Sequence, residues 1–557
     1  MSTAYINGKI YTIDKKESVA EAVLIEDGKF KLIGTNEEVL NADPNARVEN
    51  LEGKCVLPAF FEAHAHISAA VSTMYDIPLN DLGSTGEYIK AVKDYYAENP
   101  DVTFIRGFGW KNTCINTEKN PRAMLDSVTT SIPIFLSSED CHSTWVNSKA
   151  IELAGITSET SVENGIIEKT EDGKPNGIFR DTASALIESE CPDYSVDEYK
   201  ASFEQYFKDI YQYGFAGGLD ALVEIDTNNY TAYRQLESEG KMPVYVCQAI
   251  HSGQQNTYEA ASQTLKSMQK LPEYKKIRSK TLKIFLDGVV EGTTAALSEP
   301  YEKEAGMPEG YKCKPMWDQQ ELNKTVALAD KMKIQVHIHA IGDMASKMAA
   351  DAFEYAAKCN GSIKEQRHII THLQLVLPET IEKMGRLGVI AVINPYWHFK
   401  DDYYYNIQVP FLGEERAEHE YPVRSFLESG VMIASASDFP VTCPVNPFEG
   451  MQIAITRRVP KTPDGNLAFG STSDVGNPKY DIPIWPEEAP SLTDMIKSFT
   501  INAAYSCFLD DRIGSIEEGK EANFIIINND IYQVPEEKLC EIRVLKTIVE
   551  GNEVYRL

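Results

Sequence analysis

The sequence predicts an α/β protein built around an eight-stranded (β/α)8 TIM barrel. Short apolar runs rich in β-branched residues recur through the middle of the chain, and most are followed by amphipathic segments such as ELNKTVALADKMK. Strands that alternate with helices predict a parallel sheet, and eight such units close most naturally as a barrel. No glycine-rich phosphate turn follows any run, which disfavours a doubly wound sheet. The expected strands are 55–66, 214–222, 243–250, 282–290, 334–343, 368–374, 389–395 and 431–439.

Both ends of the chain are predicted to be β-rich. In residues 1–56, apolar and polar residues alternate in short stretches separated by Asn-Gly and Asp-Gly turns, and residues 513–557 repeat this pattern. We therefore expect the two ends to pair into one small β-sandwich beside a barrel that spans 57–512. Two separate end domains would have the same pattern.

The interval between the first and second expected strands, residues 67–213, is far longer than a barrel connection needs. It contains a strand-like run, IPIFLSS, and helix-like stretches of its own. Insertions into barrels often shape the active site at the C-terminal ends of the strands. We therefore predict an inserted subdomain at about 70–210 on the catalytic face.

The composition restricts the class of partner. The 557 residues include 54 Lys and Arg against 83 Asp and Glu, giving a net charge of −29 and a pI of ≈ 4.8. A surface this acidic repels phosphate backbones and anionic lipid. We therefore expect no nucleic-acid or membrane partner. The ten Cys include no CxxC pair, no apolar run is as long as a membrane helix, and the first residues lack the features of a secretory signal. These features predict a soluble cytoplasmic protein that acts on a small molecule, with homo-oligomerisation left open.

Four histidines and one aspartate fall at the C-terminal ends of expected strands, where barrel enzymes keep their active sites. They are His64, His66, His339, His372 and Asp438. Residues two apart on a strand share a face, so both imidazoles of the His-Ala-His sequence can point at one metal. His337 shares a strand face with His339, but His339 is favoured because it is nearer the strand end. The set predicts a metal site.

Lys283 is the other unusual residue of the expected strands. It shares a strand face with Phe285 and Asp287. An ammonium inside a barrel is costly to desolvate unless it is paired or chemically changed. Two interpretations remain open: a salt bridge with Asp287 or Asp438, or addition of carbon dioxide to give a carbamate that can bridge two cations.

The motifs FFEAHAH, LKIFLDG, HAIGD, THLQ and SASDFPV occur in this order, together with EDCHSTWVNSKAIELAGI and GVVEGTTAALSEPY. As a set they resemble the amidohydrolase superfamily of metal-dependent hydrolases. More narrowly they resemble its family 3, the branch that includes N-substituted formamide deformylases. The resemblance covers nearly the whole chain. It implies a (β/α)8 barrel with a small β-sandwich made from both chain ends, and it does not specify a substrate.

The resemblance also implies a ligand set: His64, His66, Lys283, His339, His372 and Asp438. The first two histidines would bind the more buried metal, with Asp438 close to it and to the attacking water. A carboxylated Lys283 would bridge to a second metal held by the other two histidines. We expect two zinc ions, although manganese, iron or nickel suits similar ligands.

Further residues are candidates for catalysis and substrate binding. Asp438 would move the proton of the attacking water, and His142 from the insertion would assist the developing oxyanion. Trp110, Arg180 and Trp397 are candidate substrate-binding residues. The sequence departs from the family pattern at four positions, Ala59, Glu62, Cys141 and Thr371. Cys141 would alter the pocket or offer a soft ligand.

The predicted function is metal-dependent hydrolysis of a C–N bond other than a peptide bond, in an amide or an N-substituted formamide. A mononuclear deaminase of a cyclic amidine is the alternative. Such enzymes place a Glu shortly after the fifth-strand His, whereas Ala-Ile-Gly-Asp follows His339 here. A non-catalytic binding protein would have lost part of the ligand set, yet all six positions are intact.

Overall fold

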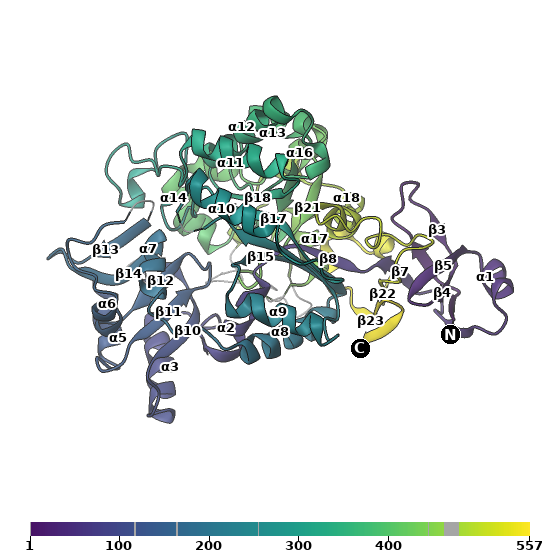
Figure 1. The fold of residues 1–557 in the computed structure, drawn as a ribbon, viewed down its shortest axis with the longest axis horizontal. Helices are drawn as coiled ribbons and strands as arrows, with labels where there is room; N and C mark the ends of the chain where they lie inside the picture. Colours follow the sequence, from purple (N-terminus) through teal and green to yellow (C-terminus); the bar gives the residue numbers. More distant parts are fainter. Residues whose placement is uncertain (1, 116–117, 163–164, 254, 444, 462–477) are drawn as a thin grey trace.

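The computed structural model describes residues 2–115, 118–162, 165–253, 255–443, 445–461 and 478–557. The molecule is elongated. A helix-covered barrel occupies the middle, a mixed α/β insertion lies on one side of it, and a β-sandwich that holds both chain termini lies on the other (Figure 1).

The central sheet has eight strands in sequential order, and every hydrogen-bonded neighbour pair is parallel. This confirms the predicted barrel. The segment after the last strand contacts the C-terminal end of the first strand, because the Asp438 amide donates to His64 O at 3.0 Å and the His66 amide donates to Phe439 O at 2.7 Å. The strands are β8 (Phe60–Ala65), β15 (Phe215–Val223), β16 (Tyr245–His251), β17 (Ile277–Phe285), β18 (Gln335–Ala340), β19 (Ile369–His372), β20 (Ile390–Ile393) and β21 (Ile433–Ser435).

The limits of all eight strands differ from those expected, and two of the differences involve a change of sheet or a shift along the chain. The run 55–66 splits, because β7 (Cys55–Pro58) belongs to the β-sandwich and only β8 enters the barrel. The run expected at 282–290 instead occupies 277–285. Its last part leaves the sheet because the Asp287 carboxylate accepts hydrogen bonds from the backbone amides of Ala296, Ile341 and Gly342.

Amphipathic helices cover the outside of the barrel. In α11, for example, Leu322, Val326 and Ala329 recur at helical spacing and are fully buried. The Asp318 side chain caps this helix by accepting from two of its first amides. The helices after β8 and the insertion are α8 (Val196–Tyr211), α9 (Asn228–Ser238), α10 (Tyr258–Met268), α11 (Gln319–Lys331), α12 (Asp343–Asn360), α13 (Pro378–Leu387), α14 (Val409–Leu412), α15 (Glu414–Glu418), α16 (Val423–Glu428), α17 (Pro447–Thr456), α18 (Leu492–Phe499) and α19 (Ile501–Ser506).

The two chain ends share one six-stranded sheet of order β24-β23-β22-β7-β2-β3. A second, four-stranded sheet of order β5-β4-β1-β6 comes from the N-terminal end alone. The remaining strands and the short helix are β1 (Thr3–Ile6), β2 (Lys9–Tyr11), β3 (Val19–Ala20), β4 (Ala22–Glu26), β5 (Lys29–Gly34), α1 (Asn36–Ala42), β6 (Arg47–Asn50), β22 (Phe524–Ile527), β23 (Val544–Val549) and β24 (Asn552–Arg556). Since β7 leads directly into β8, the sandwich joins the barrel at the N-terminal end of its first strand.

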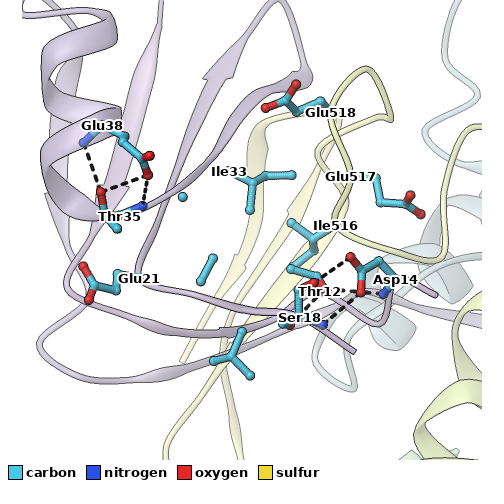
Figure 2. Close-up of a pocket in the computed structure, with 13 residues that line it drawn as sticks. Thr12, Asp14, Ser18, Glu21, Ile33, Thr35, Glu38, Ile516, Glu517 and Glu518 are labelled. Atoms are coloured by element: carbon cyan, nitrogen blue, oxygen red, sulfur yellow. Dashed lines mark hydrogen bonds between the residues drawn. The ribbon is translucent and has the colours of Figure 1, made fainter. Parts of the chain in front are cut away.

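A cavity of about 490 Å³ opens in the sandwich between the two chain ends, and Figure 2 shows its lining. It contains none of the predicted site residues. Its carboxylates serve local structure: Asp14 accepts from Ser18 at 2.9 Å, and Glu38 accepts from Thr35 in the capping box of α1. This cavity is therefore separate from the catalytic face.

The insertion forms a six-stranded sheet of order β13-β14-β12-β11-β10-β9. Helix α8, although within the expected segment 70–210, instead packs Phe203, Phe207 and Ile210 into the core of the barrel. The elements are α2 (Ala70–Tyr75), β9 (Ile77–Pro78), α3 (Thr85–Glu98), β10 (Ile105–Trp110), α4 (Asn112–Ile115), α5 (Pro121–Asp126), β11 (Ile134–Ser138), β12 (Ser143–Val146), α6 (Ser148–Leu153), β13 (Gly165–Lys169), β14 (Pro175–Asp181) and α7 (Thr182–Glu188). Within the described residues, none of the helices has the length and apolar character that crossing a membrane requires.

Candidate metal centre

The C-terminal ends of four barrel strands bring the five predicted histidine and aspartate side chains into one cluster. Asp438 Oδ1 lies 3.1 Å from His64 Nε2 and 3.4 Å from His66 Nε2. The ring of His372 lies 5.0 Å from that of His64 and 4.5 Å from that of His339, measured between ring centroids. The cluster is therefore continuous from β8 through β19 to β18, and all but His66 are almost fully buried.

Three buried polar atoms in and beside this cluster lack the well-directed hydrogen bonds that buried polar atoms normally have. Within the described part of the chain, Lys283 Nζ has no hydrogen-bond partner, and His64 Nε2 and Asp438 Oδ1 lie 3.1 Å apart without the geometry of a hydrogen bond. One ligand atom each from His64, His372 and Asp438 lies within 4.8 Å of the other two. Imidazole nitrogens and carboxylate oxygens that converge in this way fit a divalent metal. This trio combines residues that the family resemblance divides between two metals.

Three histidines of the cluster, His64, His339 and His372, are held in the neutral form that binds metals. Burial lowers the pKa of His64 and of His339 well below the ordinary value, and the charge of Lys283 lowers both further. Burial also lowers the pKa of His372 to about 4, although Asp438 opposes the shift. These three imidazoles are therefore ready ligands at neutral pH.

Lys283 is fully buried in β17, and its Nζ lies 4.5 Å from the centre of the Phe285 ring. Within the described residues, Lys283 forms no ion pair with Asp287 or Asp438. The Asp287 carboxylate instead accepts hydrogen bonds from backbone amides. The salt bridge considered for Lys283 is therefore not formed. Burial lowers the pKa of Lys283 to about 7, against the opposing charge of Asp438. Much of this amine is neutral at physiological pH.

Residues behind the cluster fix its orientation, and the sequence did not identify them. His337 Nε2 lies 2.7 Å from His64 Nδ1, and Asn394 Oδ1 lies 2.9 Å from His372 Nδ1. Glu62 Oε1 accepts from the backbone amides of His64 at 3.2 Å and Ser437 at 3.0 Å, which ties β8 to the segment that carries Asp438. Such partners set which ring nitrogen faces a metal. Two of these residues had a signal in the sequence: Glu62 is close to the His-Ala-His sequence, and His337 shares a strand face with His339.

Glu62→Ala is expected to lower the free energy of unfolding by about 2–4 kcal/mol, because it leaves two buried backbone amides without an acceptor. Urea denaturation monitored by circular dichroism measures the change. Glu62→Gln is the matched control, since one amide oxygen can accept both hydrogen bonds, as Oε1 does now. Equal stability losses in the two variants would contradict this role for Glu62.

His142 reaches the barrel from the insertion. Its ring centroid lies 5.4 Å from that of His339, and its Nδ1 lies 2.7 Å from Asp181 Oδ1. Burial alone would lower the pKa of His142, but the hydrogen bond and charge of Asp181 outweigh it and raise the pKa to about 9. This imidazole therefore carries a positive charge at neutral pH, unlike those of His64, His339 and His372.

Two of the expected substrate-binding residues do not line the site. Trp110 is fully buried in the core of the insertion beside Trp145, and its indole N–H donates to Leu136 O at 2.8 Å. The Arg180 guanidinium is also buried, pairs with Glu168 and donates to Asn112 Oδ1 at 2.7 Å. Both expectations were wrong, because the aromatic ring and the cation are used to build the insertion.

Other candidates lie beside the cluster. Trp397 stacks on His372, with 5.5 Å between centroids and 13° between ring planes, and its Nε1 donates to Thr442 Oγ1 at 3.1 Å. Cys141 precedes His142, lies in the left-handed region at φ +62° and is an exposed residue. His251 also ends a barrel strand, and its Nδ1 lies 3.1 Å from Glu224 Oε1. Its strand-end position was the signal by which it could have been found.

The protein-family model described as "Amidohydrolase family" matches residues 47–555 of the chain. Among individual proteins, the chain is 29% identical to Protein LONG AFTER FAR-RED 3 of Arabidopsis thaliana, over 99% of this chain and 91% of that protein. It is 28% identical to the N-substituted formamide deformylase of Arthrobacter pascens, over 98% and 97% of the two chains.

Among solved structures, an uncharacterized metal-dependent hydrolase from Pyrococcus furiosus has the same fold. Its TM-score is 0.69 at 24% sequence identity, and the match covers 95% of this chain and 99% of that one. The agreement over nearly the full length of both chains includes the barrel and the sheets that flank it.

Proposed function

Since the chain belongs to the amidohydrolase family, we propose that it hydrolyses the C–N bond of a small amide or N-substituted formamide with a metal-activated water. The observation that carries the proposal is the convergence of His64, His372 and Asp438 ligand atoms within 4.8 Å at the C-terminal mouth of the barrel. The similarity to an N-substituted formamide deformylase over nearly the whole chain supports the choice of bond.

The proposed ligands are the six residues predicted from the sequence: His64, His66, Lys283 in carboxylated form, His339, His372 and Asp438. We propose two divalent ions per chain, with zinc favoured by the imidazole and carboxylate donors and manganese, iron or nickel also suited to them. A divalent metal at such a site supplies activation of water at neutral pH and polarisation of a carbonyl oxygen.

The side chains of this protein would move the protons and hold the substrate. The Asp438 carboxylate accepts the proton that the attacking water loses and passes it to the departing nitrogen. His142 donates a hydrogen bond to the carbonyl oxygen as negative charge develops there. Trp397, stacked on His372, gives the site an apolar wall that suits a planar or apolar substituent.

Metal analysis of the purified protein, combined with assays of acid release from N-formyl and N-acyl amines, tests the proposal. We expect about two metals per chain, loss of activity after chelation, and recovery when metal is returned. Full activity of metal-free protein would refute it. One metal per chain together with ammonia release from a cyclic amidine would assign the deaminase instead.

Two histidine variants sharpen this test. His372→Asn is expected to lose metal, whereas His368→Asn is expected to keep it. His368 is equally buried and lies at the other end of β19, where its Nε2 is 3.3 Å from Asp330 Oδ1. Equal metal loss in both variants would indicate a general effect on folding rather than ligation.

A further inference from the structure

Asp181 occupies a strained position that its place in the chain does not explain. It is the last residue of β14 and the N-cap of α7, and it has φ +49° and ψ −123°. Such a conformation is strained for a non-glycine residue, persists only where the surrounding structure holds it, and is found often at active sites. An aspartate at an N-cap normally accepts from the first amides of the helix. The Asp181 side chain makes no such bond.

The carboxylate instead faces His142. Asp181 Oδ1 lies 2.7 Å from His142 Nδ1, and the Asp181 amide donates to His142 O at 2.8 Å. The two residues are therefore joined by both backbone and side chain, at the end where β12 and β14 pair antiparallel. The Asp181 side chain is 2% exposed, and its Oδ2 has no hydrogen-bond partner among the described residues.

The barrel makes room for this carboxylate. A Cβ atom added to Gly288, in the loop after β17, would lie 2.4 Å from Asp181 Oδ1 and 2.6 Å from Oδ2. Gly288 O in turn lies 3.3 Å from His339 Nε2. The insertion thus meets the histidine and aspartate cluster at Gly288, which has no side chain. The Asp181 carboxylate packs directly against this glycine.

We propose that Asp181 is a positioning residue that holds His142 by its Nδ1 and leaves Nε2 for the carbonyl oxygen of the substrate. This inference rests on the proposed function for its catalytic consequence. The contact between the two side chains is a separate claim that can be measured in protein without substrate.

The first experiment measures the contact. A hydrogen-bonded imidazole N–H gives a downfield proton resonance in protein labelled with 15N-histidine, and it is assigned by its loss in His142→Asn. We expect this resonance in the wild type and its disappearance in Asp181→Ala, which removes the acceptor. Gly288→Ala should also remove or shift it, because the added methyl group displaces the intact carboxylate. Absence of the resonance from the wild type, or its persistence in Asp181→Ala, would overturn the proposal whatever the enzyme hydrolyses.

The second experiment measures the consequence. Asp181→Ala is expected to lower kcat about 100-fold, the cost of one misplaced oxyanion donor, with metal content and KM close to wild type. The same substitution should cost little in the His142→Asn background, because the residue it positions is gone. Equal losses of kcat in both backgrounds would overturn the positioning role.

Asp318→Ala provides the matched control. Asp318 is also an N-cap aspartate, but it is exposed and accepts from the amides of Gln320 and Glu321 in α11. It should lower the melting temperature without changing kcat. If the wild type hydrolyses none of the N-formyl and N-acyl amines, the proposed function fails, and the resonance still decides whether Asp181 holds His142.

Discussion

Asp438→Asn is expected to reduce kcat by about 10⁴-fold in a protein that remains folded. Asparagine keeps the size of aspartate and one oxygen for a metal, but it cannot accept a proton from water. The backbone contacts of this residue do not depend on the carboxylate. They include the hydrogen bond that its backbone amide donates to His64 O at 3.0 Å. The loss should therefore fall on chemistry rather than on closure of the barrel.

The measurement pairs kcat with metal content and thermal stability. Asp330→Asn is the matched control, since Asp330 is also a buried aspartate near a histidine, His368, but lies on α11 away from the cluster. It should alter stability and leave kcat close to wild type. If Asp438→Asn retained full kcat, another group would have to accept the proton, and the proposed mechanism would be wrong.

The barrel and the cluster were predictable because both follow from local patterns. Apolar runs of strand length alternated with helical periodicity, and the metal-ligating residue types fell at the ends of those runs. Parallel strands bring their C-terminal ends to one face, so His64 and Asp438 were expected to meet although 374 positions separate them in the sequence.

The residues that support the cluster could not be predicted in the same way. Glu62 matters because it bonds Ser437, and Asp181 because it bonds His142 and packs against Gly288. These contacts depend on side-chain direction and on how the insertion docks, neither of which has a sequence period. Trp110 and Arg180 failed for the same reason: their residue types suited a pocket, but the strand register of the insertion turned them into its interior.

Lys283→Ala is expected to lose most of the bound metal and to lower kcat/KM by at least about 100-fold, the upper range for residues that support a metal site. Lys283 Nζ is buried without a hydrogen-bond partner among the described residues, and its pKa near 7 leaves a neutral amine able to add carbon dioxide. The carbamate would give the cluster an anionic oxygen donor that neither alanine nor an ammonium can replace. Metal analysis and steady-state kinetics on the same preparation measure both losses.

Chemical rescue separates a missing ligand from a damaged fold. The Lys283→Ala variant has a cavity where the lysine side chain was. With metal added, a short carboxylate such as propionate should enter this cavity and restore part of the activity, because its oxygens replace those of the carbamate. Lys283→Arg is the control, since it keeps a positive charge and cannot form the carbamate, and it should stay inactive under the same conditions. Metal-free wild type should likewise recover faster in bicarbonate than in buffer freed of carbon dioxide. An active Lys283→Arg enzyme with a full complement of metal would show that this lysine acts without carboxylation.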